Sequence, residues 1–288
     1  MKKISIVIPV FNEEAHIENT IHQLDEIIRS SENDFDVIFV NDGSTDKTEQ
    51  VLKALDADFF SVIHHETNRG YGSALKTGIA HASSPYICIA DADGTYPLDE
   101  IPRLAEALSD GYDMVVGARS GEMVKIPFLR RLPKWILNKL CNYLSGFKIP
   151  DINSGFRIMR KTSVERFYHI LPNGFSFTTT ITIAMLTNNM RVHFLPINYF
   201  VRHGKSKIRP VYDTFNFLQL IIRTSLYFNP LKVFIPLSVF FFFNAFLVLT
   251  LSWLFADKIM DVTFGIFIMT SVMALSIGML ADLIDKRL

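Results

Sequence analysis

The sequence lacks several features that would settle its class on their own. It contains two cysteines, Cys88 and Cys141, without metal-ligand spacing, so neither a disulfide framework nor a thiolate metal site is expected. The formal net charge is zero, so the charge of the whole chain argues neither for nor against binding of nucleic acid. The chain also has no internal repeat and no low-complexity linker. The function must therefore be sought in local motifs.

Charge is absent from two long stretches near the end of the chain, Val233–Ala256 and Val262–Ala281. As helices rising about 1.5 Å per residue, they would be roughly 36 and 30 Å long, which matches the hydrocarbon core of a bilayer, about 30 Å. Two buried helices of a soluble protein could share this composition, but two in succession at this length favour a membrane anchor. We therefore predict transmembrane helices over residues 231–256 and 262–282.

The charges that flank these stretches predict an orientation. Arg223 and Lys232 precede the first stretch, Lys286 and Arg287 follow the second, and the connector 257–261 contains a single lysine. Because positively charged flanks stay in the cytoplasm, both ends of this hairpin are expected there. The sequence thus predicts a multi-pass protein of the cytoplasmic membrane with a cytosolic main domain.

Short apolar runs alternate with stretches of helical periodicity in the first part of the chain. The runs expected to form strands are Ile4–Val10, Phe35–Val40, Phe59–His64, Tyr86–Ala90 and Met114–Val116. The stretches expected to form helices are Glu14–Arg29, Lys47–Leu55, Tyr71–His81 and Pro97–Leu108. This order predicts an α/β domain over about residues 1–210, with a mostly parallel sheet covered on both faces. Such sheets bind ligands beyond the carboxyl ends of their strands.

Polar motifs lie at that expected edge: Asn12-Glu13, Asn41–Ser44 and Asp91–Asp93. Two carboxylates at the end of a buried strand, such as Asp91 and Asp93, repel each other and are costly to ionise without a cation. Mg²⁺ or Mn²⁺ would resolve this, since both prefer carboxylate and phosphate oxygens. The alternative is a surface turn at Asp93-Gly94, but the position favours a metal that binds a diphosphate.

Two further turns could bind a nucleotide. The turn Asn41–Ser44 could simply cap the next helix, but Asp42 is not needed for capping and could accept hydrogen bonds from a ribose or a base. Gly70 and Gly72 would allow a nucleotide to approach the start of the helix that follows them.

Basic amphipathic character distinguishes residues 127–147, where aromatic and aliphatic side chains alternate with arginine and lysine. This composition is typical of a helix lying in the membrane interface, with a core-packing helix as the alternative. A second such stretch, residues 211–230, is expected to form a juxtamembrane helix that leads into the first span.

The ordered motifs resemble those of family 2 glycosyltransferases, which have the Rossmann-like GT-A fold. The motifs that carry this resemblance are Ile8–Glu14, Asn41–Asp46, Gly70–Ala74 and Asp91–Gly94. A second set is similar to the dolichol-phosphate mannose synthase branch, which includes bacterial polyprenyl-phosphate glycosyltransferases with a C-terminal pair of spans. This set is Gly117–Arg119, Asn153–Arg157 and Arg202–Lys207.

The resemblance implies roles for individual residues. The metal, Mg²⁺ or Mn²⁺, would be held on the donor diphosphate by Asp91 and Asp93, which form the implied catalytic set together with Arg119 and Arg202. The remaining donor-binding residues would be Pro9, Phe11, Glu13, Asp42, Gly70, Lys205 and Lys207. The acceptor phosphate would contact Arg119, Ser154 and a basic residue of the amphipathic stretch, either Arg130 or Arg131.

Two departures bear on the acceptor. Many relatives carry an acidic residue near the segment that here reads Gly174–Thr180, and this chain has none there. The Gln-x-x-Arg-Trp motif of processive polysaccharide synthases is also missing, since Gln219–Arg223 fails on spacing and on tryptophan. A phosphate monoester has a second pKa near 6, so it is largely dianionic at neutral pH and needs no catalytic base.

We therefore expect a metal-dependent hexosyltransferase that moves one sugar, with inversion, from a UDP- or GDP-sugar to polyprenyl phosphate, such as the undecaprenyl or dolichyl form. The expected partners are a nucleotide sugar, the lipid phosphate and the membrane, with no nucleic acid, and a homo-oligomer is left open. The product would serve cell-envelope glycan synthesis. One alternative is a membrane glycosyltransferase that acts on a sugar or a lipid-diphosphate-sugar, and the other is a non-catalytic membrane scaffold that retains the fold.

Overall fold

The computed structural model describes residues 2–55, 57–108, 111–119, 139, 142–143, 146–174, 176–200, 226, 229–255 and 260–285. The chain divides into two compact units. One contains Met1–Ile136 and Lys148–Thr214, and the other contains Leu137–Phe147 and Phe215–Leu288. The predicted interfacial stretch 127–147 and juxtamembrane stretch 211–230 lie mostly outside the described residues.

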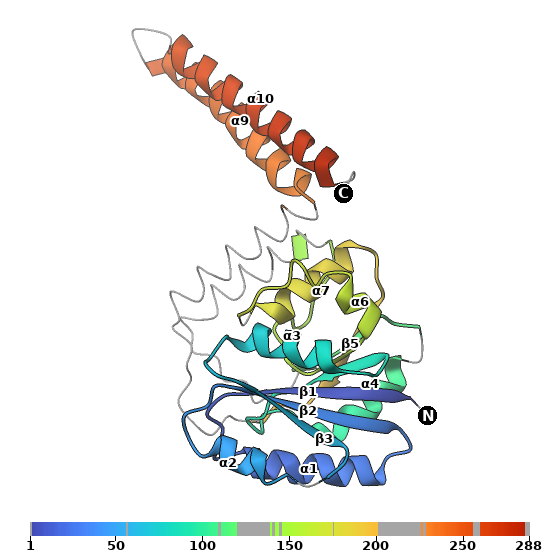
Figure 1. Ribbon diagram of the computed structural model, residues 1–288. Coiled ribbons are helices and arrows are strands. Elements are labelled where there is room, and N and C mark those ends of the chain that lie inside the picture. The colour runs from blue at the N-terminus through green and yellow to red at the C-terminus, as the bar shows by residue number, and fades with distance from the viewer. Residues whose placement is uncertain are drawn as a thin grey trace. The chain divides into compact units, whose positions relative to one another are not determined.

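A seven-stranded sheet forms the centre of the first unit (Figure 1). Its strands are β1 (Lys3–Val10), β2 (Asp34–Asp42), β3 (Phe60–His65), β4 (Tyr86–Ile89), β5 (Met114–Arg119), β6 (Arg157–Arg160) and β7 (Val192–Ile197), in the spatial order β3-β2-β1-β4-β6-β5-β7. All paired strands are parallel except β6, which is antiparallel to both β4 and β5. The predicted mostly parallel sheet is confirmed.

Helices cover both faces of this sheet (Figure 1). They are α1 (Ile17–Ser30), α2 (Thr48–Lys53), α3 (Tyr71–His81), the 3-10 helix η1 (Leu98–Glu100), α4 (Ile101–Ala107), α6 (Lys161–Glu165) and α7 (Phe177–Thr187). Alternation along β1 explains the two layers, because successive side chains of a strand point to opposite faces. Ile4, Ile6 and Ile8 join a buried cluster with Leu24 of α1. On the other face, Gly78 of α3 approaches Val7 so closely that an added Cβ would lie 2.3 Å from its Cγ1.

The direction of β6 determines which residues reach the functional edge. Its first residue, Arg157, pairs with Ile89 at the carboxyl end of β4 and with Val116 of β5. The start of the antiparallel strand therefore lies at the same edge as the ends of its parallel neighbours. The preceding segment, Asp151–Phe156, is delivered to that edge.

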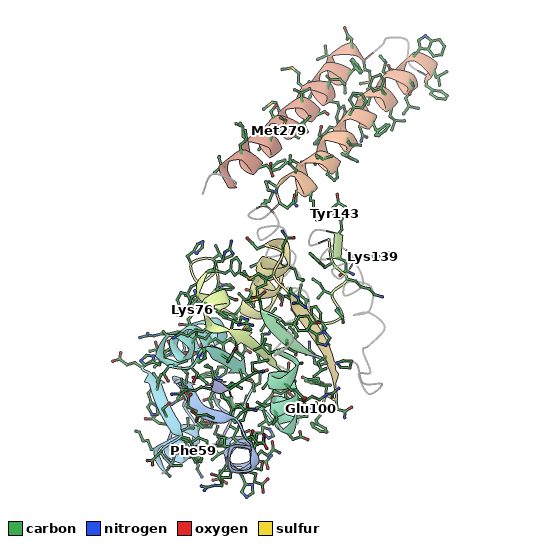
Figure 2. All side chains as sticks on the ribbon, turned by 90° about the vertical axis from the view of Figure 1, so that its right-hand side faces the viewer. Phe59, Lys76, Glu100, Lys139, Tyr143 and Met279 are labelled. Carbon is green, nitrogen blue, oxygen red and sulfur yellow. The ribbon has the colours of Figure 1, made fainter. Side chains whose placement is uncertain are left out.

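The second unit contains two long helices, α9 (Leu231–Phe255) and α10 (Asp261–Asp285). Their mean hydropathies are 2.2 and 2.1, and both are long and apolar enough to cross a membrane. The side chain of Met279, 54% exposed, is typical of their outer surface (Figure 2). Between the helices, the hydroxyl oxygens of Ser238 and Ser271 lie 3.0 Å apart and are buried. The predicted helices are present, and their insertion into a membrane stays a prediction.

Candidate active site

Asp91 and Asp93 follow β4 at the carboxyl edge of the sheet, and both are partly exposed. The phenol O–H of Tyr71, the first residue of α3, donates to Oδ1 of Asp91 at 2.9 Å. Oδ1 of Asp93 accepts hydrogen bonds from the Thr95 hydroxyl at 2.6 Å and from its backbone N–H at 3.2 Å. Both carboxylates are therefore oriented by neighbouring donors.

Gly155 leaves room for the Asp91 carboxylate. An added Cβ would lie 2.8 Å from Oδ2 of Asp91 and 3.0 Å from the hydroxyl oxygen of Tyr71, so a side chain would displace both groups. The Gly155 N–H donates to the hydroxyl oxygen of Tyr96 at 2.8 Å. Burial and the nearby Asp91 charge raise the pKa of Tyr96, which keeps its phenol neutral.

The donor set fits a divalent cation that is shared with a substrate. Among the described residues, no group of three or more His, Cys, Asp or Glu side chains could hold a metal ion. Mg²⁺ is commonly bound through one or two carboxylates together with substrate phosphates, and does not need a complete protein cage. The oriented carboxylates of Asp91 and Asp93 match that arrangement.

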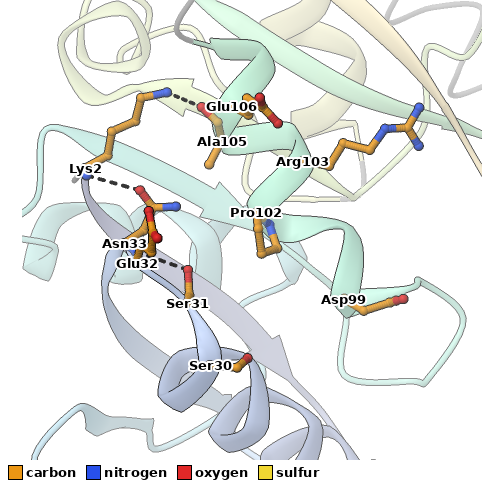
Figure 3. A pocket seen from close by; sticks show the side chains of 10 residues that line it. All are labelled: Lys2, Ser30, Ser31, Glu32, Asn33, Asp99, Pro102, Arg103, Ala105 and Glu106. Atoms are coloured by element: carbon orange, nitrogen blue, oxygen red, sulfur yellow. Dashed lines mark hydrogen bonds between the residues drawn. The ribbon is translucent and has the colours of Figure 1, made fainter.

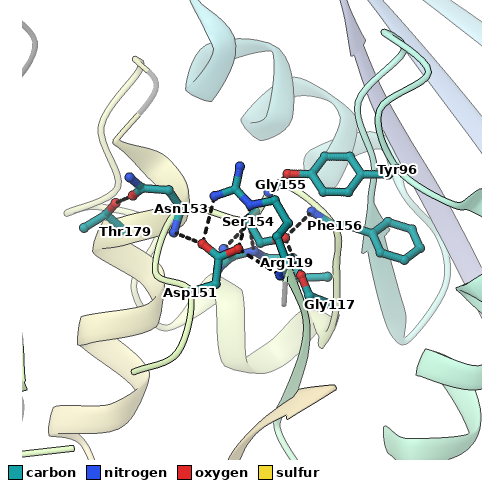
Figure 4. A network of polar contacts seen from close by, with 10 residues as sticks. Tyr96, Gly117, Arg119, Asp151, Asn153, Ser154, Gly155, Phe156 and Thr179 are labelled. Carbon is teal, nitrogen blue, oxygen red and sulfur yellow. Dashed lines mark hydrogen bonds and ion pairs between the residues drawn. The ribbon is translucent and has the colours of Figure 1, made fainter. Parts of the chain in front are cut away.

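Arg119, at the end of β5, forms a forked ion pair with Asp151 (Figure 4). Its Nε and Nη2 donate to the two carboxylate oxygens at 2.6 and 2.8 Å, and its backbone N–H donates at 3.1 Å. Burial opposes the charged forms of both groups, but the pairing raises the pKa of Arg119 and lowers the pKa of Asp151. The guanidinium carbon lies 5.2 Å from the ring centre of Tyr199. Among the described residues, Nη1 of Arg119 has no hydrogen-bond acceptor, so this nitrogen could donate to a second anion.

Ser154 lies beside this pair but is fully buried (Figure 4). Its hydroxyl donates to the Gly117 carbonyl at 2.6 Å and accepts from the Phe156 N–H at 3.3 Å. The structure thus brings Arg119 and Ser154 together, and their predicted contact with an acceptor phosphate stays a prediction. The contacts of the Ser154 hydroxyl, however, are within the protein.

Arg157 has a position that the sequence did not predict. Its guanidinium is fully buried and donates to the carbonyls of Ser154 and Thr178 and to the hydroxyl of Thr182. Burial lowers its pKa to about 10. Arg157 therefore ties the Ser154 segment to α7. The motif Asn153–Arg157 drew attention to this residue, but only the tertiary contacts reveal its role.

The first two loops at this edge are tied together by backbone-to-side-chain bonds. Asn12, with a φ of 52°, donates its N–H to the Ser44 hydroxyl at 3.0 Å, and Glu13 donates its N–H to the Thr48 hydroxyl at 3.0 Å. The predicted donor-binding residues Pro9, Phe11 and Glu13 are all partly exposed beside these bonds. Their predicted contact with a nucleotide stays a prediction.

Asp42 is 3% exposed and makes several contacts within the protein. Its carboxylate accepts the backbone N–H groups of Arg69 and Gly70 at 2.9 and 2.8 Å, and it pairs with His65 at 2.7 Å. Gly70 lies close to protein backbone in this structure, and the predicted approach of a nucleotide to it stays a prediction. An added Cβ there would lie 2.7 Å from the carbonyl oxygen of Asn173.

The other predicted basic residues lie outside the described residues: Arg130, Arg131, Arg202, Lys205 and Lys207. A surface depression of about 620 Å³ lies elsewhere, at the amino ends of the strands (Figure 3). Its lining includes Lys2, Asn33 and Arg103. It is at the opposite edge of the sheet from Asp91 and shares no residue with the site described above.

The chain belongs to the family of sugar-transferring proteins whose model, Glycosyl transferase family 2, matches residues 5–167. It is 31% identical over 205 residues to an undecaprenyl-phosphate 4-deoxy-4-formamido-L-arabinose transferase of Pseudomonas paraeruginosa, covering 69% of this chain and 55% of that protein. It is 28% identical over 208 residues to a dolichyl-phosphate hexose transferase of Haloferax volcanii, covering 72% and 87%. The chain thus spans about half the length of the Pseudomonas relative.

The fold is similar to a solved structure of glucosyl-3-phosphoglycerate synthase from Mycobacterium tuberculosis, in complex with Mn²⁺, UDP-glucose and phosphoglyceric acid. The TM-score is 0.61 at 21% identity, over 78% of this chain and 80% of the other. The GT-A fold predicted from the sequence is confirmed.

Proposed function

We propose that this protein transfers a single sugar from a nucleotide-sugar donor to polyprenyl phosphate, in a metal-dependent and inverting reaction at the cytoplasmic membrane. The observation that carries the proposal is the edge that gathers Asp91, Asp93 and the Arg119–Asp151 pair. A carboxylate pair suits a metal-bound diphosphate, and an arginine suits a second anion.

The relatives support the same substrates. The two sequence relatives are named as transferases of a sugar and a polyprenyl phosphate, undecaprenyl phosphate in one and dolichyl phosphate in the other. The solved structure contains Mn²⁺ and UDP-glucose. The apolar helices α9 and α10 would hold the enzyme where a polyprenyl lipid is found. The choice between UDP and GDP, and between Mg²⁺ and Mn²⁺, is left to experiment.

In the proposed reaction, an oxygen of the lipid phosphate attacks the anomeric carbon of the sugar as the bond to the nucleotide diphosphate breaks. A bound divalent cation would neutralise the departing diphosphate, and Asp91 and Asp93 would hold it there. Arg119, already oriented by Asp151, would present Nη1 to the lipid phosphate. The predicted basic residues Arg202, Lys205 and Lys207 would add positive charge over the donor.

The surroundings of Arg119 favour a phosphate over a hydroxyl as acceptor. A sugar hydroxyl would need a general base, but the first turn of α7 contains no acidic residue. Asp151 lies close by, yet its lowered pKa and its ion pair with Arg119 make its carboxylate a poor base. The alternative of a sugar acceptor therefore gains no support from this site.

The test is a donor and acceptor screen with the full chain in membranes. Labelled UDP- and GDP-sugars are supplied with undecaprenyl phosphate, and product is followed by extraction of labelled lipid. Undecaprenol without the phosphate is the matched acceptor, and Asp93→Ala is the matched protein control. We expect transfer only to the phosphate and only with intact Asp93. Equal transfer to undecaprenol or to a free sugar would refute the proposal, and failure to bind any nucleotide sugar would revive the scaffold alternative.

A further inference from the structure

Tyr71 connects the predicted metal site to the start of α3. Its O–H donates to Oδ1 of Asp91 at 2.9 Å. Gly155 packs against this hydrogen bond. An added Cβ there would lie 2.8 Å from Oδ2 of Asp91 and 3.0 Å from the hydroxyl oxygen of Tyr71. The carboxylate of Asp91 is therefore held in one orientation.

The residues just before Tyr71 are fixed by Asp42. One carboxylate oxygen accepts the N–H of Arg69 at 2.9 Å, and the other accepts the N–H of Gly70 at 2.8 Å. Gly70 has a φ of 98°, a backbone conformation that residues other than glycine rarely adopt. The turn that delivers Tyr71 to Asp91 thus depends on one buried carboxylate.

His65 holds Asp42 in turn. Its Nδ1 lies 2.7 Å from Oδ1 of Asp42, and its Nε2 lies 2.9 Å from the hydroxyl of Thr77 on α3. The side chains of His65 and Asp42 are each only 4% exposed. A carboxylate only accepts hydrogen bonds, so Nδ1 carries the proton toward Asp42. Strands β2 and β3 and helix α3 are joined by this buried chain.

We propose that Tyr71 is a positioning residue for the metal-binding carboxylate of Asp91, and that Asp42 acts on the metal site by fixing the turn that places Tyr71. The proposal rests on the metal site of the proposed function. Outer partners of metal ligands typically contribute about ten- to a hundredfold to metal affinity, because they fix the orientation of the ligand. Asp42 would serve this purpose whether or not it also contacts the donor.

The experiment measures Mn²⁺ affinity directly, by electron paramagnetic resonance of free Mn²⁺ in titrations of the full chain in detergent. Separate samples contain saturating UDP or GDP. Tyr71→Phe removes only the hydroxyl, and we expect the dissociation constant for Mn²⁺ to rise about tenfold to a hundredfold. Tyr168→Phe is the matched control. The Tyr168 hydroxyl also contacts α3, but it donates to the carbonyl of Lys76 at 2.9 Å and not to Asp91. The Mn²⁺ affinity of this variant should equal that of the wild type.

Asp42→Asn tests the second half of the proposal. It should weaken Mn²⁺ binding even at saturating nucleotide, and adding Tyr71→Phe should weaken it little further, because both changes disturb one contact. Thermal unfolding of each variant checks that it is folded. Wild-type protein that binds no Mn²⁺ with either nucleotide would remove the metal site of the proposed function, and this proposal with it. Mn²⁺ binding by the wild type that is unchanged in Tyr71→Phe would overturn this proposal alone.

Discussion

The Arg119–Asp151 pair allows stability and acceptor recognition to be separated by two substitutions. Arg119→Ala removes the guanidinium that we assign to the lipid phosphate, and it also leaves Asp151 without its partner. Asp151→Asn breaks the same ion pair but keeps the guanidinium. The two variants should lose similar stability and differ in acceptor kinetics.

The magnitudes follow from the burial of the pair. Breaking a buried ion pair by removing one partner costs about 3–5 kcal/mol. Side-chain exposures of 26% for Arg119 and 12% for Asp151 place this pair near the lower end, about 3 kcal/mol. For a domain of this size that corresponds to a fall in Tm of roughly 6–12 °C. Loss of one charge-assisted contact to the phosphate, about 1.5–3 kcal/mol, would lower kcat/KM for the acceptor about ten- to a hundredfold in Arg119→Ala alone.

Thermal unfolding in detergent, followed by circular dichroism, gives the first quantity. Initial rates at varied undecaprenyl phosphate and saturating donor give the second, at a temperature where both variants are folded. Binding of the nucleotide donor should survive in both. The reasoning is refuted if Arg119→Ala and Asp151→Asn lose acceptor kcat/KM equally, since the effect would then follow from the fold. It is also refuted if Arg119→Ala uses the acceptor as well as the wild type.

Four further outcomes are expected. Folded Asp93→Ala should show no transfer in the lipid-extraction assay, and full activity of this variant in EDTA would remove the metal hypothesis. A cysteine placed in the connector 256–261, on a background without Cys88 and Cys141, should be labelled from outside intact cells, whereas labelling only after permeabilisation would cancel the predicted orientation. The lowered pKa of Asp151 stabilises the fold above about pH 4 and ceases to do so as pH falls through the folded pKa, so the Tm gap between wild type and Asp151→Asn should narrow below that pH. A gap that is constant from pH 7 to pH 3 would contradict this. Transfer should weaken below about pH 6, where the lipid phosphate gains a proton, and activity that is level from pH 7 to pH 5 would argue against a dianionic acceptor.

Local patterns were sufficient for the first half of the sheet. The five predicted strands all form. β1, β2, β4 and β5 are rich in apolar residues and largely buried between the helix layers, whereas β3, at the edge of the sheet, is mostly only partly buried. The two unpredicted strands lack that signal. β6 is only four residues long and has arginine at both ends, and β7 contains a proline and a histidine. Both are strands because their neighbours in the sheet pair with them.

The site shows a similar division. The position of Asp91 and Asp93 at the ligand-binding edge could be predicted, because both directly follow a strand of a parallel sheet and such sheets bind ligands beyond the carboxyl ends of their strands. The partners of Asp42 could not, because His65 and Gly70 reach it only after the β2–β3 pairing forms. The same applies to Asp151, which contacts Arg119 although the two residues are 32 positions apart in the sequence. Short-range spacing contains no information on such contacts.

The antiparallel direction of β6 has a consequence for how this protein could be re-engineered. Because β5 runs toward the functional edge and β6 runs away from it, the connection between Arg119 and Arg157 begins and ends at that one edge of the sheet. That segment can therefore be exchanged between related chains as an insert, without altering the strand order. Chimeras joined within β5 and β6 would test whether this connection determines acceptor preference while the rest of the sheet, with Asp91 and Asp93, stays constant.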